Sequence, residues 1–141
     1  MISAVNLRKT YGDKVAVNNI NIDVKKGELF AYIGPNGSGK STTIKMLMGL
    51  LEPTSGTVEI LSQPMDLNNL ELKKKISFVP DTPDVIGKLT GHEYLNFVAS
   101  VYQMSKAAYD QKRTELVDMF ELTNDLGTLI EEYSHGMRQK L

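Results

Sequence analysis

The feature that most constrains this sequence is a glycine-rich bend within residues 31–47, which read AYIGPNGSGKSTTIKML. Four of its residues satisfy the pattern G-x-x-x-x-G-K-[ST], namely Gly34, Gly39, Lys40 and Ser41. A chain of phosphates must come within hydrogen-bond distance of several backbone amides, and a β-carbon would obstruct that approach, which accounts for glycine at positions 34, 37 and 39. The pattern predicts a site for a nucleoside triphosphate.

Both flanks of the bend fit this interpretation. Residues 29–33 are apolar at every position, which predicts a strand buried on both faces, as in a parallel sheet. Helical spacing follows at Ile44, Leu47, Met48 and Leu51. The N-terminus of that helix offers unpaired amides and the positive end of its dipole to an anion. Lys40 adds a mobile charge for the outer phosphates, and the Ser41 hydroxyl is a candidate Mg²⁺ ligand. The competing interpretation is a glycine turn that only joins the strand to the helix.

Composition limits the remaining function classes. The chain has 141 residues, 41% of them hydrophobic, and a formal charge of −1. Such a balance indicates a globular domain without the basic field that a nucleic-acid partner requires. Cysteine is missing from the sequence, which excludes disulfides and thiolate metal sites. No apolar run approaches the ~20 residues that span a bilayer, so work at a membrane requires a partner with the spans.

The chain has two halves of different character. Residues 1–82 are predicted to be rich in strands, with further strands over 20–24, 57–61 and 76–80. Residues 83–141 are predicted to be helical. Thr90 and Glu93 have the spacing of a capping box at a helix start. Ser105 is a candidate N-cap for the next helix, whose inner face is predicted to hold Tyr109, Leu116, Met119 and Phe120.

The end of the chain carries a second motif. Residues 131–141, EEYSHGMRQKL, resemble the signature motif of the ATP-binding-cassette (ABC) family, in the Y-S-x-G-M-x-Q-K variant of bacterial export cassettes. Residues 33–60 are similar to the same family throughout, so the resemblance covers essentially the whole chain. It implies an α/β fold of the P-loop NTPase, ABC ATPase type, with an N-terminal antiparallel β part and a helical subdomain. One departure is His135, where the commoner signature has glycine.

The resemblance assigns roles to individual residues. Ser134, His135 and Gly136 would meet the γ-phosphate of an ATP held by a second nucleotide-binding subunit, so that two chains enclose two nucleotides. Asp81 stands where the family has a glutamine that reaches Mg²⁺, and an ordinary Asp-Thr-Pro turn is the alternative there. Tyr11 matches the aromatic residue that stacks on adenine, with a tyrosine packed at the turn before Gly12 as the alternative. The predicted set of ATP contacts within the chain is Tyr11, Val15, Asn36, Gly37, Ser38, Gly39, Lys40, Ser41 and Thr42.

Other parts of the family pattern have no counterpart in this sequence. The family continues beyond the signature into an aspartate-ending strand, a catalytic glutamate and a histidine switch, whereas His92 and His135 lie in the wrong places for that switch. We therefore expect no catalytic residue here, and an inactive chain by itself. Two strands of the family's core would be missing, which predicts unpaired edges and bare apolar faces. A piece of a longer protein, truncated after the signature, and a rearranged oligomer both remain open.

The leading functional prediction is the ATP-binding, ATP-hydrolysing subunit of a bacterial transporter. It would lie in the cytoplasm on the inner face of the cell membrane, with residues 83 to about 133 docked on a separate transmembrane permease subunit. The alternatives are a soluble ABC ATPase of translation or DNA repair, and a nucleotide-binding module that does not hydrolyse ATP. Only 53 positions separate Asp81 from Ser134 (134 minus 81). That interval has no sustained heptads, which disfavours the repair and chromosome relatives with their long coiled coils.

Overall fold

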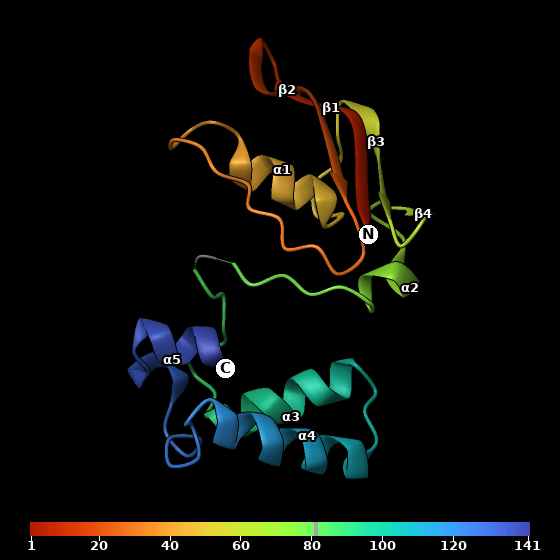
Figure 1. The fold of residues 1–141 in the computed structure, drawn as a ribbon. Helices are drawn as coiled ribbons and strands as arrows, with labels where there is room; N and C mark the ends of the chain where they lie inside the picture. Colours follow the sequence, from red (N-terminus) through yellow and green to blue (C-terminus); the bar gives the residue numbers. More distant parts are fainter. Residues whose placement is uncertain (81) are drawn as a thin grey trace. The chain divides into compact units, whose positions relative to one another are not determined.

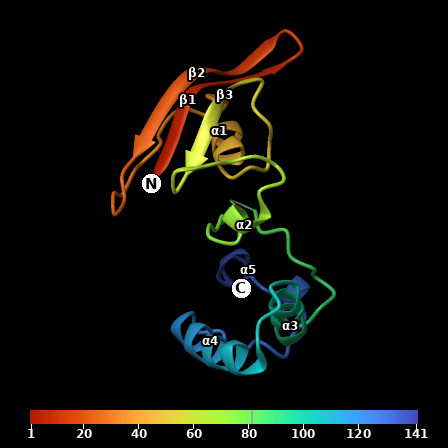
Figure 2. The ribbon, with the colours of Figure 1, turned by 90° about the vertical axis from the view of Figure 1, so that its right-hand side faces the viewer.

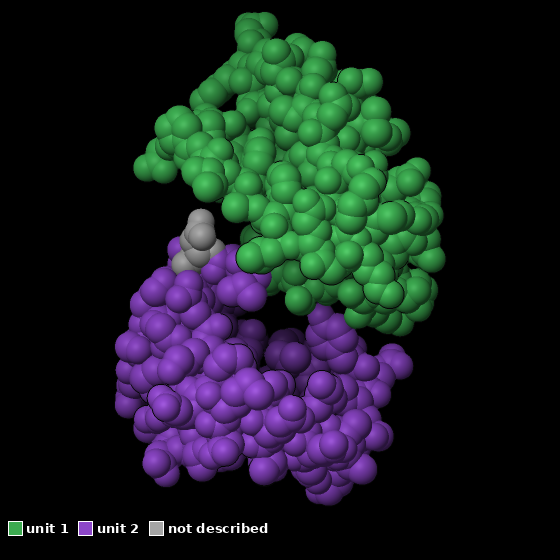
Figure 3. Space-filling view, viewed as in Figure 1, with its two compact units in different colours: residues 1–78 green, residues 79–141 purple. Residues whose placement is uncertain are grey.

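The computed structural model describes residues 1–80 and 82–141. The chain divides into two compact units, Met1–Phe78 and Val79–Leu141, which Figure 3 draws in different colours. The division predicted from the sequence lies after residue 82. Each unit contains its own group of buried side chains.

The first unit is built on a four-stranded sheet in which every neighbouring pair is antiparallel. Its spatial order is β2 (Lys14–Val24), β1 (Ile2–Tyr11), β3 (Ser55–Ile60) and β4 (Gln63–Pro64). The predicted strand at 20–24 is the second half of β2, and the one at 57–61 overlaps β3. Both of these predictions are confirmed.

The sequence pattern did not indicate β1, although this strand pairs with both β2 and β3. Its alternation of buried and exposed residues breaks between Ala4 and Leu7, which are both buried although they lie three positions apart. Asn6 lies between them with a positive φ of 50°, and the pairing register shifts there. Its amide donates to the side chain of Asn21 at 2.8 Å. A bulge of this kind hides a strand from a search for strict alternation.

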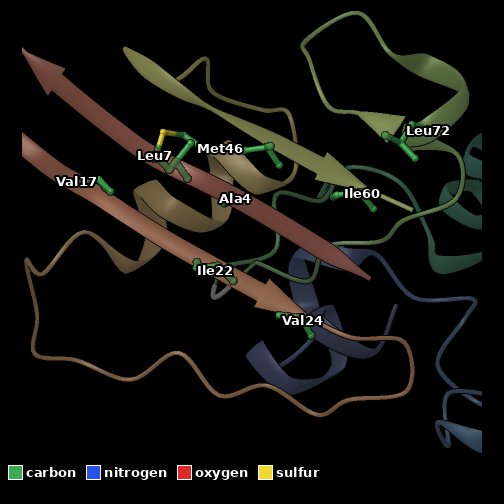
Figure 4. Packing of buried hydrophobic residues seen from close by; sticks show 9 residues of the cluster. Ala4, Leu7, Val17, Ile22, Val24, Met46, Ile60 and Leu72 are labelled. Carbon is green, nitrogen blue, oxygen red and sulfur yellow. The ribbon is translucent and has the colours of Figure 1, made fainter. Parts of the chain in front are cut away.

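The helix α1 (Lys40–Leu47) follows the glycine bend and packs on one face of this sheet (Figures 1 and 2). Its Met46 is buried beside Leu7 of β1, as Figure 4 shows. A short helix, α2 (Leu70–Lys73), begins at the cap Asn69 and buries Leu72. The buried apolar cluster of this unit comprises Ala4, Leu7, Val17, Ile22, Val24, Met46, Val58, Ile60 and Leu72.

Two predicted strands, at 29–33 and 76–80, are wrong for this structure, because neither segment is extended in a sheet. Figure 1 draws the connection between β2 and α1 as plain coil. Leu29 is 98% exposed and Ile33 89%, which is the reverse of the burial on both faces that the apolar run predicted. A central strand exists only when strands flank it and pair with its backbone groups. Among the described residues, none pairs with either segment. The exposure of Leu29 and Ile33 confirms the prediction of bare apolar faces.

The second unit consists of short helices. They are α3 (Gly91–Val101), α4 (Lys106–Met119), the 3₁₀ turn η1 (Ile130–Glu132) and α5 (His135–Lys140). The predicted capping box at the start of α3 is present, since Thr90 accepts from the Glu93 amide and the Glu93 carboxylate accepts from the Thr90 amide. Ser105 caps α4 as predicted. Within residues 1–80 and 82–141, no helix has both the length and the apolar character needed to cross a bilayer.

The predicted inner face of α4 is largely wrong. Leu116, Met119 and Phe120 are 40%, 62% and 40% exposed, and Tyr109 is only half-buried. The buried side chains of this unit come instead from other segments, and they are Ala99, Leu122, Leu126, Ile130 and Tyr133. An apolar stripe becomes a core only where a second layer covers it, and within the described part of the unit α4 lies at the margin.

Candidate nucleotide-binding site

The glycine bend has the backbone shape of an anion cradle. Gly37 and Gly39 both lie at positive φ, +80° and +90°, a region that side-chain-bearing residues rarely adopt. Gly39 is the residue before α1 and therefore occupies its N-cap. Because glycine carries no capping side chain, the first-turn amides of α1 have no side-chain acceptor among the described residues. These amides are open to a ligand with negatively charged oxygens.

Gly39 is also the point where the bend touches the sheet. A β-carbon built at this position would lie 2.3 Å from the carbonyl oxygen of Ala16 and 3.2 Å from a methyl carbon of Val17. Both residues belong to β2, the second strand of the hairpin that carries Tyr11 and Val15. The same glycine thus supplies a backbone conformation and a close approach between the bend and β2.

The side chain of Lys40 is folded over the bend. Its Nζ donates to the carbonyl oxygens of Gly34 at 2.7 Å and Pro35 at 2.8 Å. The Ser38 amide donates to the Pro35 carbonyl at 3.3 Å, so the bend closes on itself around the ammonium group. A β-carbon at Gly34 would come within 2.7 Å of the Ser38 hydroxyl. A positive charge is therefore held at the centre of the bend, beside the open amides.

The remaining predicted contacts of the bend follow in order. Asn36 and Ser38 are exposed on the loop, and Ser41 is exposed in the first turn of α1. Thr42 is half-buried, and the helical hydrogen bonds begin with the amide of Thr43 donating to Gly39 at 2.8 Å. The residues named in the pattern thus lie on one continuous stretch from loop to helix.

The fit to Mg²⁺ rests on oxygen donors. At a phosphate site Mg²⁺ is held by phosphate oxygens, waters and a few protein oxygens, so the protein must offer an exposed oxygen donor beside the cradle. Ser41 meets that description. The other predicted metal ligand, Asp81, lies outside the described residues. Among those that are described, no cluster of three histidine or acidic side chains offers a separate metal site.

The predicted adenine platform lies at the tip of the β1–β2 hairpin. Tyr11 pairs with Lys14 across a two-residue turn, and its side chain is 52% exposed. Val15 is also exposed, whereas Val17 is buried in the core, so only the first of these valines is available to a base. Sequence analysis missed Lys9, whose Nζ lies 5.4 Å from the centroid of the Tyr11 ring. Its position two residues before Tyr11, on the same strand, is the sequence signal that could have revealed it.

The signature residues are in the second unit, at the start of α5. Ser134 is the N-cap, and its hydroxyl accepts from the Met137 amide at 3.2 Å, as predicted for a helix start. His135 and Gly136 are exposed, and a β-carbon at Gly136 would meet no described atom within 4 Å. These three residues lie in a different unit from the glycine bend.

Tyr133 anchors the signature, although sequence analysis gave it no structural role. Its side chain is 2% exposed, and its hydroxyl donates to the Asp125 carbonyl at 2.7 Å. A β-carbon at Gly91 would lie 2.4 Å from that hydroxyl, so a glycine in α3 makes room for the ring. Burial raises the pKa of the Tyr133 hydroxyl. Arg138 donates to the Tyr133 carbonyl at 3.0 Å, which ties the first turn of α5 to the anchor.

Known proteins resemble this chain along its whole length. The sequence model of the ABC transporter family matches residues 17–141. The chain is 34% identical to the bacitracin transport ATP-binding protein BcrA of Bacillus licheniformis over 142 aligned positions. It is 35% identical to the linearmycin resistance ATP-binding protein LnrL of Bacillus subtilis. Each alignment covers 100% of this chain and 45% of the relative, so the chain spans about half the length of the curated relatives it matches.

Solved structures give the same result for the fold. An ATP-binding subunit of an ABC transporter superposes with a TM-score of 0.87 at 31% identity, over 99% of this chain and 58% of the neighbour. The ATP-binding cassette MJ0796, solved as a dimer in a post-hydrolysis state with ADP and Pi, gives 0.83 at 30% identity over 99% of this chain and 66% of that one. The fold predicted from the glycine bend and the signature is confirmed.

Proposed function

Because the chain belongs to the ABC transporter family, we propose that it is the nucleotide-binding part of an ATP-hydrolysing transporter subunit. In this proposal ATP binding and hydrolysis in the intact protein drive transport through a separate transmembrane permease subunit. The two named relatives act in bacitracin transport and linearmycin resistance, which supports export. The subunit would work in the cytoplasm, against the inner face of the membrane.

One observation carries the proposal, the geometry of the glycine bend. Gly37 and Gly39 lie at positive φ, and the first turn of α1 has no side-chain cap. The Lys40 ammonium is already held at the bend by two carbonyl oxygens. When a triphosphate binds, its oxygens are stronger partners for an ammonium group than neutral carbonyls are. Lys40 would then release Gly34 and Pro35 and bind the outer phosphates.

The rest of the nucleotide has its own proposed contacts. Adenine would stack on the exposed ring of Tyr11 beside Val15, and Mg²⁺ would take the hydroxyl of Ser41 and oxygens of the phosphates. Bound Mg²⁺ would neutralise the charge that develops on the phosphates during hydrolysis. The open first turn at Ser134 would meet the ATP of a second nucleotide-binding subunit. The dimeric state of MJ0796 with ADP and Pi supports this pairing of subunits.

A lysine substitution tests the proposal. Lys40→Ala removes the charge and the donor that the triphosphate requires, so we expect Mg-ATP binding to fall below detection by isothermal titration calorimetry. Lys45→Ala is the matched control, because Lys45 is an exposed lysine of the same helix outside the bend. The control should bind Mg-ATP like the unsubstituted protein. An unchanged affinity in Lys40→Ala would contradict the proposed site.

A further inference from the structure

The Tyr11 ring already has a partner on one of its faces. Lys9 lies two residues earlier on β1, and its Nζ is 5.4 Å from the ring centroid, within the range in which an ammonium group is attracted to an aromatic face. We propose that Lys9 is a positioning residue that fixes the Tyr11 ring and leaves only its opposite face for a purine base. This inference rests on the proposed function, because it assumes that Tyr11 receives the base.

Lys9 is held in place by the segment that follows α1. Its Nζ donates to the carbonyl oxygen of Glu52 at 2.6 Å, and the residue is half-buried. The neighbouring residues of β1 bind the same segment, since the Thr54 amide donates to the Arg8 carbonyl at 2.8 Å and the Thr10 amide donates to the Thr54 hydroxyl at 3.0 Å. A lysine side chain normally moves freely in water. Here its ammonium group has a fixed acceptor and a fixed ring.

A fixed ring binds a base with less loss of freedom. Tyr11 is 52% exposed at the tip of a hairpin, where an unsupported side chain would sample several rotamers. Ordering one side chain on binding weakens the affinity, and an ordering contact that exists beforehand removes that loss. The ammonium group occupies one side of the ring, so a base can stack on the other side alone.

The contacts of Lys9 also set the platform relative to the phosphate cradle. The β1–β2 hairpin meets the start of α1 where Gly39 approaches Ala16, and it meets the segment beyond α1 where Lys9 binds Glu52. The hairpin is thus braced on both sides of the helix. ATP has a limited reach between its base and its outer phosphates, so base and phosphates bind together only if the platform lies within that reach of the phosphate site. Lys9 contributes to the second of these braces together with the Thr54 hydrogen bonds of Arg8 and Thr10.

The test separates the base from the phosphates. We would measure the affinities of the intact protein for Mg-ATP and for inorganic tripolyphosphate, which has no base, in Lys9→Met, Tyr11→Leu and the double variant. Methionine keeps the length of the side chain and removes the charge and the donor. We expect Lys9→Met to weaken ATP binding about two- to fivefold. Tripolyphosphate binding should not change, and the effect of Lys9→Met on ATP should vanish when Tyr11 is leucine.

Lys14→Met is the matched control, since Lys14 pairs with Tyr11 across the hairpin and is exposed. It removes the same charge from the same hairpin and should leave ATP affinity unchanged. An equal loss in Lys14→Met, an equal loss of tripolyphosphate affinity in Lys9→Met, or a persistent effect in the Tyr11→Leu background would each overturn the role of Lys9. If instead Lys40→Ala keeps its ATP affinity, the proposed function itself fails. If Lys9→Met leaves ATP affinity unchanged while Lys40→Ala and Tyr11→Leu weaken it, only the role of Lys9 fails.

Discussion

Gly39→Ala is the substitution whose effect the structure specifies most closely. An alanine at this position would keep a φ near +90°, which costs an L-residue about 1–2 kcal/mol. Its β-carbon would also lie 2.3 Å from the Ala16 carbonyl oxygen, so that either the bend or β2 must move. Forcing an extra carbon into a packed site costs about 1–3 kcal/mol. We therefore expect a total loss of about 2–5 kcal/mol and a large loss of ATP affinity, because the amides of the cradle move with the bend.

Gly37→Ala is the matched control within the same loop. Gly37 has nearly the same φ, +80°, but a β-carbon there would meet no described atom within 4 Å. Alanine also restricts the unfolded chain, by an amount that is equal at the two positions and cancels in the comparison. Gly37→Ala should therefore be the more stable variant, by the cost of the close contact at Gly39, about 1–3 kcal/mol.

Urea denaturation of the two variants measures the difference. With a slope of about 1–3 kcal/mol per molar urea, the midpoint of Gly39→Ala should lie below that of Gly37→Ala by on the order of 1 M. Calorimetry with Mg-ATP on the same samples measures how much ATP affinity each variant has lost. Equal midpoints for the two variants would refute the close contact between the bend and β2, and with it the expected movement of the amides in Gly39→Ala.

Three further predictions concern the second unit. Ser134→Arg places a bulky cation at the open turn and should abolish ATP-dependent dimers in sedimentation while ATP binding by the monomer persists; dimers of unchanged stability would contradict the signature role. Tyr133→Phe removes the buried hydroxyl that donates to the Asp125 carbonyl, while the Thr128 amide and hydroxyl still donate to that carbonyl. It should lower the free energy of unfolding by about 1 kcal/mol in urea, against no change if the bond is dispensable. The Thr90 amide and hydroxyl hold the pKa of Glu93 below its ordinary value, so the contribution of Glu93 to stability is complete above its unfolded pKa and is lost as the pH falls through the folded one. Thr90→Ala removes the hydroxyl and keeps the amide, so NMR titration should show the pKa of Glu93 rising in part. An unchanged value would refute the contribution of the hydroxyl.

The sequence predicted the helix starts and their caps better than it predicted the sheet. The bend, its helix and the capped starts of three other segments all depend on residues within a few positions of one another. Local chemistry fixes such features, because glycine adopts the required φ without strain and a hydroxyl reaches an amide three residues away. The apolar run 29–33 predicted a central strand, but a central strand forms only where neighbouring strands pair with it. The pattern of the run itself does not show whether such strands are present.

The misses at the site have a similar origin. Lys9 and Tyr133 act through partners far away in the sequence, Glu52 in one case and Gly91 in the other. Spacing reveals residues that share a turn or a strand face, so the pair Lys9 and Tyr11 was within reach of sequence analysis. The carbonyl that fixes Lys9 was not, because tertiary packing brings Glu52 to it.

The most direct measurement of the central claim is a crystal structure of the intact protein with Mg²⁺ and a non-hydrolysable ATP analogue. We predict phosphate oxygens at hydrogen-bond distance, about 2.7–3.2 Å, from the amides of residues 37–41, with Lys40 Nζ moved from its carbonyl partners to the outer phosphates. A polyphosphate bound elsewhere, with Lys40 still donating to Gly34 and Pro35, would contradict the account.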